Sequence, residues 1–197
     1  FASKDAMDIE GLGEKVAEQL FNLGFVKNIA DLYSLFEHRD EIIALEGWQA
    51  KSVDNLLEAI EKSKANSLER VLFGFGIKEV GEKMAKTLSR KFYTNDSLSS
   101  QDEESLLEIP DVGPTVAKSL TTWFNDEENK TLIEILKSKG QNFEFKGVTA
   151  VAANSFFSGK ICVLTGTLSS MGRKQATEIL ENLGAKVNEF SETSFDL

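Results

Sequence analysis

The chain has 197 residues, of which 27% are charged and 41% hydrophobic, and its formal net charge is −10. This composition is typical of a globular protein of one or two domains and excludes a long disordered tract. The apolar runs are too short to cross a membrane, the single cysteine excludes an internal disulfide or a cysteine-based zinc cage, and the acidic balance argues against a nucleic-acid ligand unless basic residues cluster.

A twelve-residue pattern occurs four times in the first 120 residues. The copies read IEGLGEKVAEQL, LEGWQAKSVDNL, IKEVGEKMAKTL and IPDVGPTVAKSL. We call the fifth residue of each copy the anchor; the anchors are Gly13, Gln49, Gly81 and Gly113. Each copy has large apolar residues four and one before the anchor, Ala or Val four after it, and leucine seven after it. Five shared positions in four copies indicate a structural repeat.

The spacing predicts a helix that begins directly after each anchor, because positions four and seven residues later share one helical face. Glycine at the anchor indicates either a positive φ or the close approach of another group. Pro114 follows Gly113 at a position where a helix start tolerates proline. Amphipathic segments at residues 29–36, 68–75 and 103–107 are expected to form a helix before each hairpin. The predicted unit is therefore helix, short hairpin, helix.

Each hairpin is a candidate phosphate site, because the first N–H groups of a helix lack helical partners and the helix dipole attracts anions. Residues 61–95 hold eight Lys or Arg against four acids, so basic residues do cluster locally. The candidate phosphate-binding residues are Gly11, Gly13, Lys15, Gly47, Lys51, Gly81, Lys83, Lys86, Arg90, Gly113, Thr115 and Lys118. Such contacts hold a duplex without reading its sequence.

The hairpins are not expected to contribute equally. Gln49 replaces the anchor glycine, so the second hairpin is the weakest candidate. Asp111 places a carboxylate two residues before its anchor, where it would repel DNA unless it points away. Gly81 with Lys83, inside the basic segment, is the strongest candidate. For any one hairpin a purely structural role is the alternative, but four copies together favour phosphate binding.

The sequence pattern changes near residue 145. Residues 1–145 are predicted to form one mainly helical domain, residues 146–155 a linker, and residues 156–197 the first part of a partial α/β domain. Forty residues cannot complete an independent core of this kind, so we expect that domain to be truncated or ordered only in part.

The partial domain is predicted to be a β-α-β unit with parallel strands. Residues 160–165 form an apolar strand in which Cys162 is expected to be buried. Residues 173–183 form an amphipathic helix, and residues 185–187 start a second strand. The inward positions of the helix are predicted to be Ala176, Ile179, Leu180 and Leu183.

Both parts resemble known families. IEGLG at residues 9–13 matches the hydrophobic-x-Gly-hydrophobic-Gly core of the helix-hairpin-helix motif, so the first domain resembles four tandem motifs of this kind. The series SGK, LTGTL, RK, AT and LGAKV resembles the start of a BRCT domain. That resemblance implies contact of the whole domain with other protein domains or with DNA, or phosphate contact through Thr165, Gly166 and Thr167 with Arg173 nearby.

The order of these parts, with FASKDAMDIEGLG and LERVLFGFGIKEVGE, resembles the C-terminal part of a bacterial NAD-dependent DNA ligase. The resemblance implies a cytoplasmic, nucleoid-associated protein of replication and repair that grips nicked double-stranded DNA from the minor-groove side. In that family NAD, Mg²⁺ and a structural Zn²⁺ are bound outside this region. No K-x-D-G adenylation motif occurs here, so the chain alone is expected to hold no cofactor and to be inactive. The alternative is a non-catalytic interaction or structural scaffold module of another DNA-repair protein.

Overall fold

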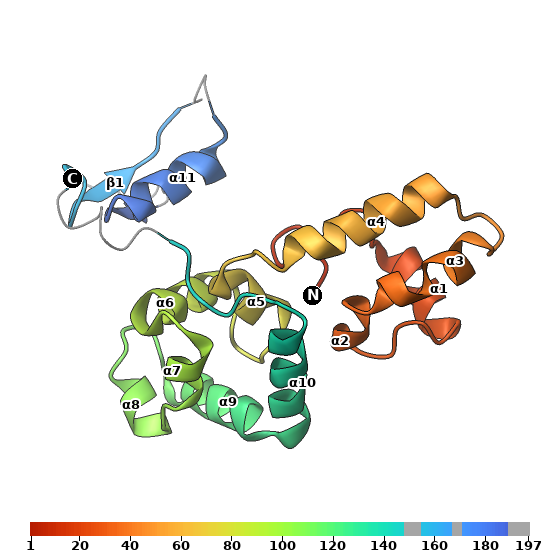
Figure 1. Ribbon diagram of the computed structural model, residues 1–197. Coiled ribbons are helices and arrows are strands. Elements are labelled where there is room, and N and C mark those ends of the chain that lie inside the picture. Colours follow the sequence, from red (N-terminus) through yellow and green to blue (C-terminus); the bar gives the residue numbers. More distant parts are fainter. Residues whose placement is uncertain (148–154, 167–170, 189–197) are drawn as a thin grey trace. The chain divides into compact units, whose positions relative to one another are not determined.

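The computed structural model describes residues 1–147, 155–166 and 171–188, which belong to two compact units, Phe1–Lys146 and Gly147–Leu197. The first unit is helical apart from an isolated antiparallel bridge between Thr94 and Glu144 (Figure 1). The second unit contains a small two-stranded parallel sheet and one helix. A mainly helical chain with an α/β unit at its end was expected, and the structure has this architecture.

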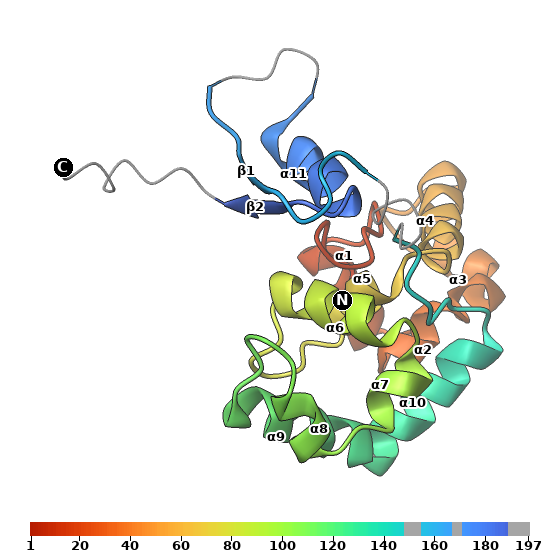
Figure 2. The ribbon, with the colours of Figure 1, turned by 90° about the vertical axis from the view of Figure 1, so that its left-hand side faces the viewer.

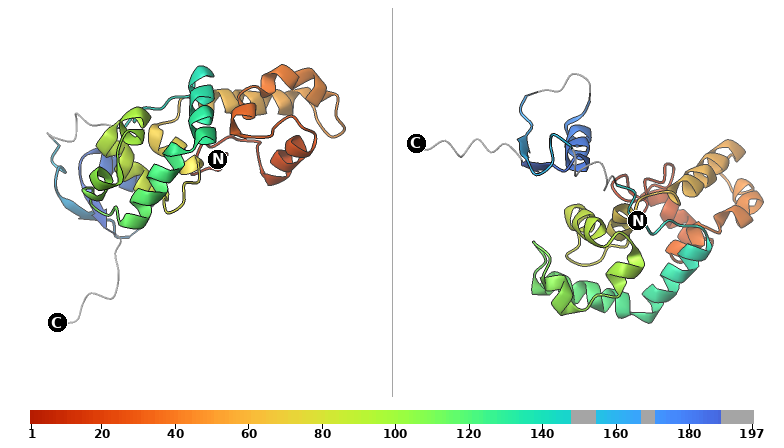
Figure 3. Two further views of the ribbon diagram at one scale, coloured as in Figure 1. Left: turned by 90° about the horizontal axis from the view of Figure 1, so that it is seen from below. Right: turned by 60° about the vertical axis from the view of Figure 1, so that its left-hand side comes forward.

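The first unit contains eleven short helical elements among its described residues. In chain order they are α1 (Glu14–Asn22), α2 (Ile29–Leu32), the 3₁₀ helix η1 (Leu35–His38), α3 (Arg39–Ile43), α4 (Ala50–Ser63), α5 (Leu68–Gly74), α6 (Glu82–Phe92), α7 (Asn95–Ser99), α8 (Glu103–Leu107), α9 (Pro114–Asn125) and α10 (Glu127–Ser138). They form two groups, α1–α4 and α5–α10 (Figure 1). Helix α10 packs against α2, so the two groups are in contact (Figure 3).

The four hairpin helices begin one residue after their anchors, as the repeat predicts. The leucine seven residues after each anchor is at most 2% exposed, and these residues are Leu20, Leu56, Leu88 and Leu120. Burial of one leucine side chain contributes roughly 1.5–3 kcal/mol. The repeat is therefore a repeat of core positions, and these side chains join one hydrophobic cluster that runs through the first unit.

The helix that precedes each hairpin was predicted less well. Helices α5 and α8 occupy two of the expected segments, and α6 and α9 pack against them. Residues 29–36 instead form α2 and the start of η1, and the helix directly before the second hairpin is α3, which packs on α4. Residues before the first hairpin form turns rather than a helix. The prediction of a helix before every hairpin is therefore wrong for the first copy.

The α5–α10 group contains the third and fourth hairpins, and residues 77 and 78 of the third hairpin line a groove with α9. Helix α9 lies beside α7, α8 and α10 (Figure 2). The Trp123 ring on α9 stacks on Phe75, the residue after α5, with ring centroids 4.8 Å apart. Phe75 in turn stacks on Phe143, at 6.3 Å. These aromatic contacts hold the two hairpins in a fixed relation.

The second unit consists of β1 (Ile161–Val163), α11 (Arg173–Asn182) and β2 (Lys186–Asn188). The strands pair in parallel, with Ile161 opposite Lys186. On α11, Ala176 is buried as predicted, but Ile179 is 42% exposed, so the prediction that Ile179 points inward is wrong. Cys162 is only partly buried, because the two short strands leave the sheet incompletely covered.

Candidate nucleic-acid interface

All four hairpins contain the same tight turn before the anchor. The backbone N–H of the residue one before the anchor donates to the carbonyl of the residue four before the anchor, with N–O distances of 3.0–3.2 Å. The residue two before the anchor has a positive φ in each copy, and these residues are Gly11 (87°), Gly47 (85°), Glu79 (65°) and Asp111 (69°). A positive φ at the third residue of a turn identifies type II geometry. Glutamate and aspartate therefore adopt the same turn as the glycines that they replace.

The anchor itself has an extended backbone. Its φ is −79° at Gly13, −84° at Gly81 and −90° at Gly113, so of the two expected reasons for glycine the positive φ is wrong, and the close approach of another group stays a prediction. A Cβ at any of these three glycines would meet nothing within 4 Å. Gln49 confirms that a side chain fits, since its backbone is extended at φ −125° and starts α4 normally. Neither the local backbone nor internal packing requires glycine at the anchor.

The hairpin helices lack the side-chain caps that other helices of the unit possess. Helices α2, α7, α8 and α10 each have a capping side chain that accepts a hydrogen bond from a backbone N–H of the first turn; these side chains are Asn28, Thr94, Asp102 and Asp126. No side-chain cap stands at Gly13, Gly81 or Gly113. At these three sites the anchor N–H donates to no other described residue and the first helical N–H groups remain available to an anion.

The second hairpin differs in this respect. The N–H of Gln49 donates to Ser52 Oγ at 3.3 Å, and Ser52 Oγ donates back to the Gln49 carbonyl at 2.8 Å. The serine therefore occupies a donor that is open in the other three copies. The second hairpin thus has one open donor fewer than the others, and its weakness as a phosphate site stays a prediction.

The predicted phosphate-binding side chains fall into two groups by exposure. Exposed side chains stand at Lys15, Lys51, Lys83, Thr115 and Lys118. Lys86 is less accessible, with 25% of its side chain exposed and an ion pair to Glu82 at 3.9 Å. Arg90 is half-buried and interacts with other residues of the chain. Of the three predicted cations on α6, Lys83 is therefore the one that is exposed, and it stands two residues after its anchor.

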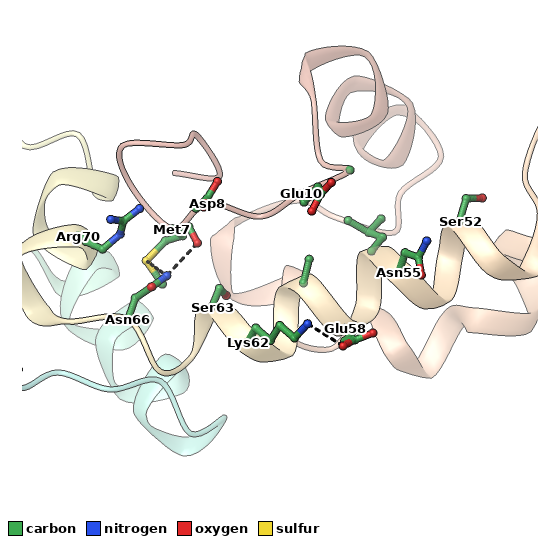
Figure 4. A pocket seen from close by; sticks show the side chains of 13 residues that line it. Met7, Asp8, Glu10, Ser52, Asn55, Glu58, Lys62, Ser63, Asn66 and Arg70 are labelled. Atoms are coloured by element: carbon green, nitrogen blue, oxygen red, sulfur yellow. Dashed lines mark hydrogen bonds and ion pairs between the residues drawn. The ribbon is translucent and has the colours of Figure 1, made fainter. Parts of the chain in front are cut away.

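A groove of about 760 Å³ lies between the first hairpin and α4. Asp8 and Glu10 stand on one wall, and Glu58 and Lys62 stand on α4, joined by an ion pair of 2.7 Å (Figure 4). Arg70 also lines this groove, but its guanidinium donates to the backbone carbonyls of residues 4 and 6, both at 2.7 Å. Both cations of the groove are thus engaged by the chain itself, which makes it a poor phosphate site.

An equivalent groove, of about 610 Å³, lies between the third hairpin and α9. It brings Thr115 and Lys118 together with Lys78 and the partly buried Trp123. Lys78 was missed as a site residue in the sequence. It occupies the position three before the anchor, where the other copies have glutamate or proline, so comparison of the copies could have found it. The third and fourth hairpins therefore share the more basic of the two grooves.

In the second unit the structure brings two of the predicted residues together. Arg173 Nη2 donates to the Gly166 carbonyl at 2.8 Å, Gly166 has φ 73°, and Thr165 is exposed. Thr167 lies outside the described residues. The Arg173 guanidinium thus holds the turn after β1, and a phosphate role for this group stays a prediction.

Comparison with known proteins identifies the first unit more closely. The model of the helix-hairpin-helix motif matches residues 70–133, which contain the third and fourth hairpins. DNA ligases of Anoxybacillus flavithermus and Brevibacillus brevis are 50% and 47% identical to the chain over 188 residues, which is 95% of its length. A DNA ligase of Bacillus cytotoxicus is 44% identical and covers the whole chain.

The chain is homologous to a segment of bacterial DNA ligases. It spans 28–30% of the length of these relatives. The predicted resemblance to bacterial DNA ligases is confirmed, as is the helix-hairpin-helix motif for residues 70–133. No helix in the described part of the chain is long and apolar enough to cross a membrane. Within the same residues, no group of His, Cys, Asp or Glu is arranged to hold a metal ion.

Proposed function

We propose that the first unit binds double-stranded DNA through the backbone of its hairpins, without reading the base sequence. The observation that carries this proposal is that the fold does not explain the glycine at three of the four anchors. Gly13, Gly81 and Gly113 have ordinary negative φ and open space where a Cβ would stand, so the fold does not require glycine. A DNA phosphate that approaches the uncapped N–H groups does require it.

The third and fourth hairpins are proposed to make the strongest contacts. They share the groove that holds Lys78 and Lys118, and Lys83 stands two residues after its anchor. The second hairpin contributes least, because Ser52 Oγ occupies the Gln49 N–H. The net charge of −10 is compatible with this local site, because phosphate contacts depend on the charges within about one Debye length.

For the longer protein we propose the activity of an NAD-dependent DNA ligase, which seals nicks in duplex DNA during replication and repair in the bacterial cytoplasm. In this proposal the described region grips nicked DNA on the minor-groove side, and NAD, Mg²⁺ and structural Zn²⁺ bind elsewhere. The sequence has one cysteine and no K-x-D-G motif, so we expect no ligation by the 197 residues alone. The second unit, as a partial BRCT domain, would contact other protein domains.

Substitution of the anchors tests DNA binding. Gly81→Gln and Gly113→Gln install the residue that the second hairpin already accepts, so both variants should fold. Each should weaken binding to a nicked duplex about tenfold, because hydrogen bonds to a charged group contribute roughly 1.5 kcal/mol. Gln49→Gly is the matched control and should not weaken binding.

Two further measurements, the salt dependence of binding and a ligation assay, test the proposal. Lys83→Gln should reduce the slope of log K against log salt by about 0.9 if the lysine neutralises one phosphate. Anchor variants that fold and bind DNA as tightly as the original chain would instead support a structural or protein-interaction module. A ligation assay in which the chain alone seals nicks would contradict the assignment of catalysis to polypeptide outside it.

A further inference from the structure

Helix α1 exposes a face that the other hairpin helices bury. The residue four after the anchor is at most 1% exposed in three copies, at Val53, Ala85 and Ala117. At the same position in the first copy, Ala17 is exposed. Eight residues after the anchor, Ser89 of α6 is fully buried whereas Phe21 of α1 is 60% exposed. Ala17 and Phe21 are four residues apart, so they form one apolar strip, which we call the α1 strip.

Each of the other hairpin helices has a partner helix that residues 1–13 do not supply to the first copy. In each of them a helix that precedes the turn packs on the hairpin helix: α3 on α4, α5 on α6 and α8 on α9. Residues 1–8 precede the first turn and contain no helix. The α1 strip is therefore the packing face of a helix-hairpin-helix motif whose first helix is not formed by residues 1–13.

The residues before the first turn are held elsewhere. Arg70 on α5 donates from Nε to the Ala6 carbonyl and from Nη2 to the Lys4 carbonyl. The Phe1 ring packs close to Gly74, also on α5, and stacks on Phe75 at 6.4 Å. These contacts fix residues 1–8 against the third repeat, so this segment is not available to cover the α1 strip.

We propose that the α1 strip docks an amphipathic helix formed by polypeptide that precedes this region in the longer ligases. The chain spans only 28–30% of those relatives, so most of their polypeptide lies outside it. In the three complete copies the covering helix comes just before the turn, which places its counterpart on that side. Glu14 and Glu18 are exposed beside the strip, so the docking helix should pair an apolar stripe with Lys or Arg at its edge.

Amide hydrogen exchange tests this proposal. The 197-residue chain is compared with the same chain extended at its N-terminus by about 20 residues, long enough for one helix. The extension is the segment that precedes the matched region in the Anoxybacillus flavithermus DNA ligase. The α1 amides should exchange at least tenfold more slowly in the extended chain, while the α9 amides, which report global stability, should not change.

A pair of substitutions in the extended chain supplies the control. Phe21→Asp should restore fast exchange in α1. Phe36→Asp, on η1 and with the same 60% exposure, should not. Equal α1 exchange in both chains would overturn the proposal. Protection of α1 in the unextended chain that grows with protein concentration would also overturn it, because a second copy would then cover the strip.

Discussion

The hydroxyl of Tyr33 lies 2.9 Å from Ser63 Oγ, and it donates a 3.0 Å hydrogen bond to Gln141 Oε1. Tyr33 follows α2, Ser63 ends α4, and Gln141 follows α10, so the network joins the two helical groups of the first unit. All three residues are at most 5% exposed. Because a buried polar atom without a partner is costly, this network favours one placement of the first hairpin pair relative to the second.

Tyr33→Phe should lower the free energy of unfolding by about 1–3 kcal/mol, since it leaves the buried Gln141 Oε1 without its donor. Urea denaturation measures this change. Tyr93→Phe is the matched control, because Tyr93 is 48% exposed and its change should stay within about 0.5 kcal/mol. Equal losses in the two variants would contradict a stabilising role for the network.

The same hydroxyl predicts a pH dependence. The pKa of Tyr33 is raised from 10 to about 12, chiefly by burial; the Ser63 hydrogen bond lowers this pKa and the nearby Glu61 raises it. From pH 10 to pH 12 the unfolded chain loses this proton while the folded chain keeps it, so stability falls as pH rises. The stability advantage of the original chain over Tyr33→Phe should shrink by roughly 1–3 kcal/mol across this window. A difference that does not vary with pH in urea denaturation would contradict this.

The internal repeat predicted much of the fold, because the positions that its copies share are buried in the core. The start of each hairpin helix and the buried leucines Leu20, Leu56, Leu88 and Leu120 follow directly from it. The exposure of Ala17 could not be predicted in the same way. The sequence has a small apolar residue at that position in either case, so it does not reveal whether a partner helix covers the position.

The sequence left two explanations for the anchor glycine open, a positive φ or the close approach of another group. The structure excludes the first, because the positive φ lies two residues earlier, where Glu79 and Asp111 replace glycine in two copies. The sequence could not separate the two positions, because acidic residues seldom adopt this backbone unless the surrounding fold imposes it. Lys78 was missed because its role depends on a groove with α9 that only the tertiary structure shows.

The two glycine positions should respond differently to alanine. Gly47 has φ 85° with open space around it, so Gly47→Ala should cost about 1–2 kcal/mol through backbone strain alone. Gly81 has φ −84°, so Gly81→Ala should change stability by no more than about 0.5 kcal/mol. Urea denaturation of both variants makes the comparison. A larger loss at Gly81 would show that the anchor, rather than the turn residue, needs glycine for folding.

Replacement of Glu79 should improve both folding and DNA binding. Its φ of 65° costs about 1–2 kcal/mol for a residue other than glycine, and glycine removes this strain. Glycine also raises the conformational entropy of the unfolded chain, which offsets roughly 0.5–1 kcal/mol of the gain. Glu79→Gly should therefore stabilise the chain by about 0.5 kcal/mol.

The exposed Glu79 carboxylate also stands two residues before the Gly81 anchor, where it repels an approaching phosphate. Its removal should tighten binding to a nicked duplex roughly threefold at low salt, and less at high salt, because the interaction is screened. Glu79→Gln separates the two effects, since it keeps the strained backbone but loses the charge: it should bind DNA as tightly as Glu79→Gly without the gain in stability. If both variants bind DNA no better than the original chain, the third hairpin does not face the phosphates, and the contact must be sought at the first or fourth.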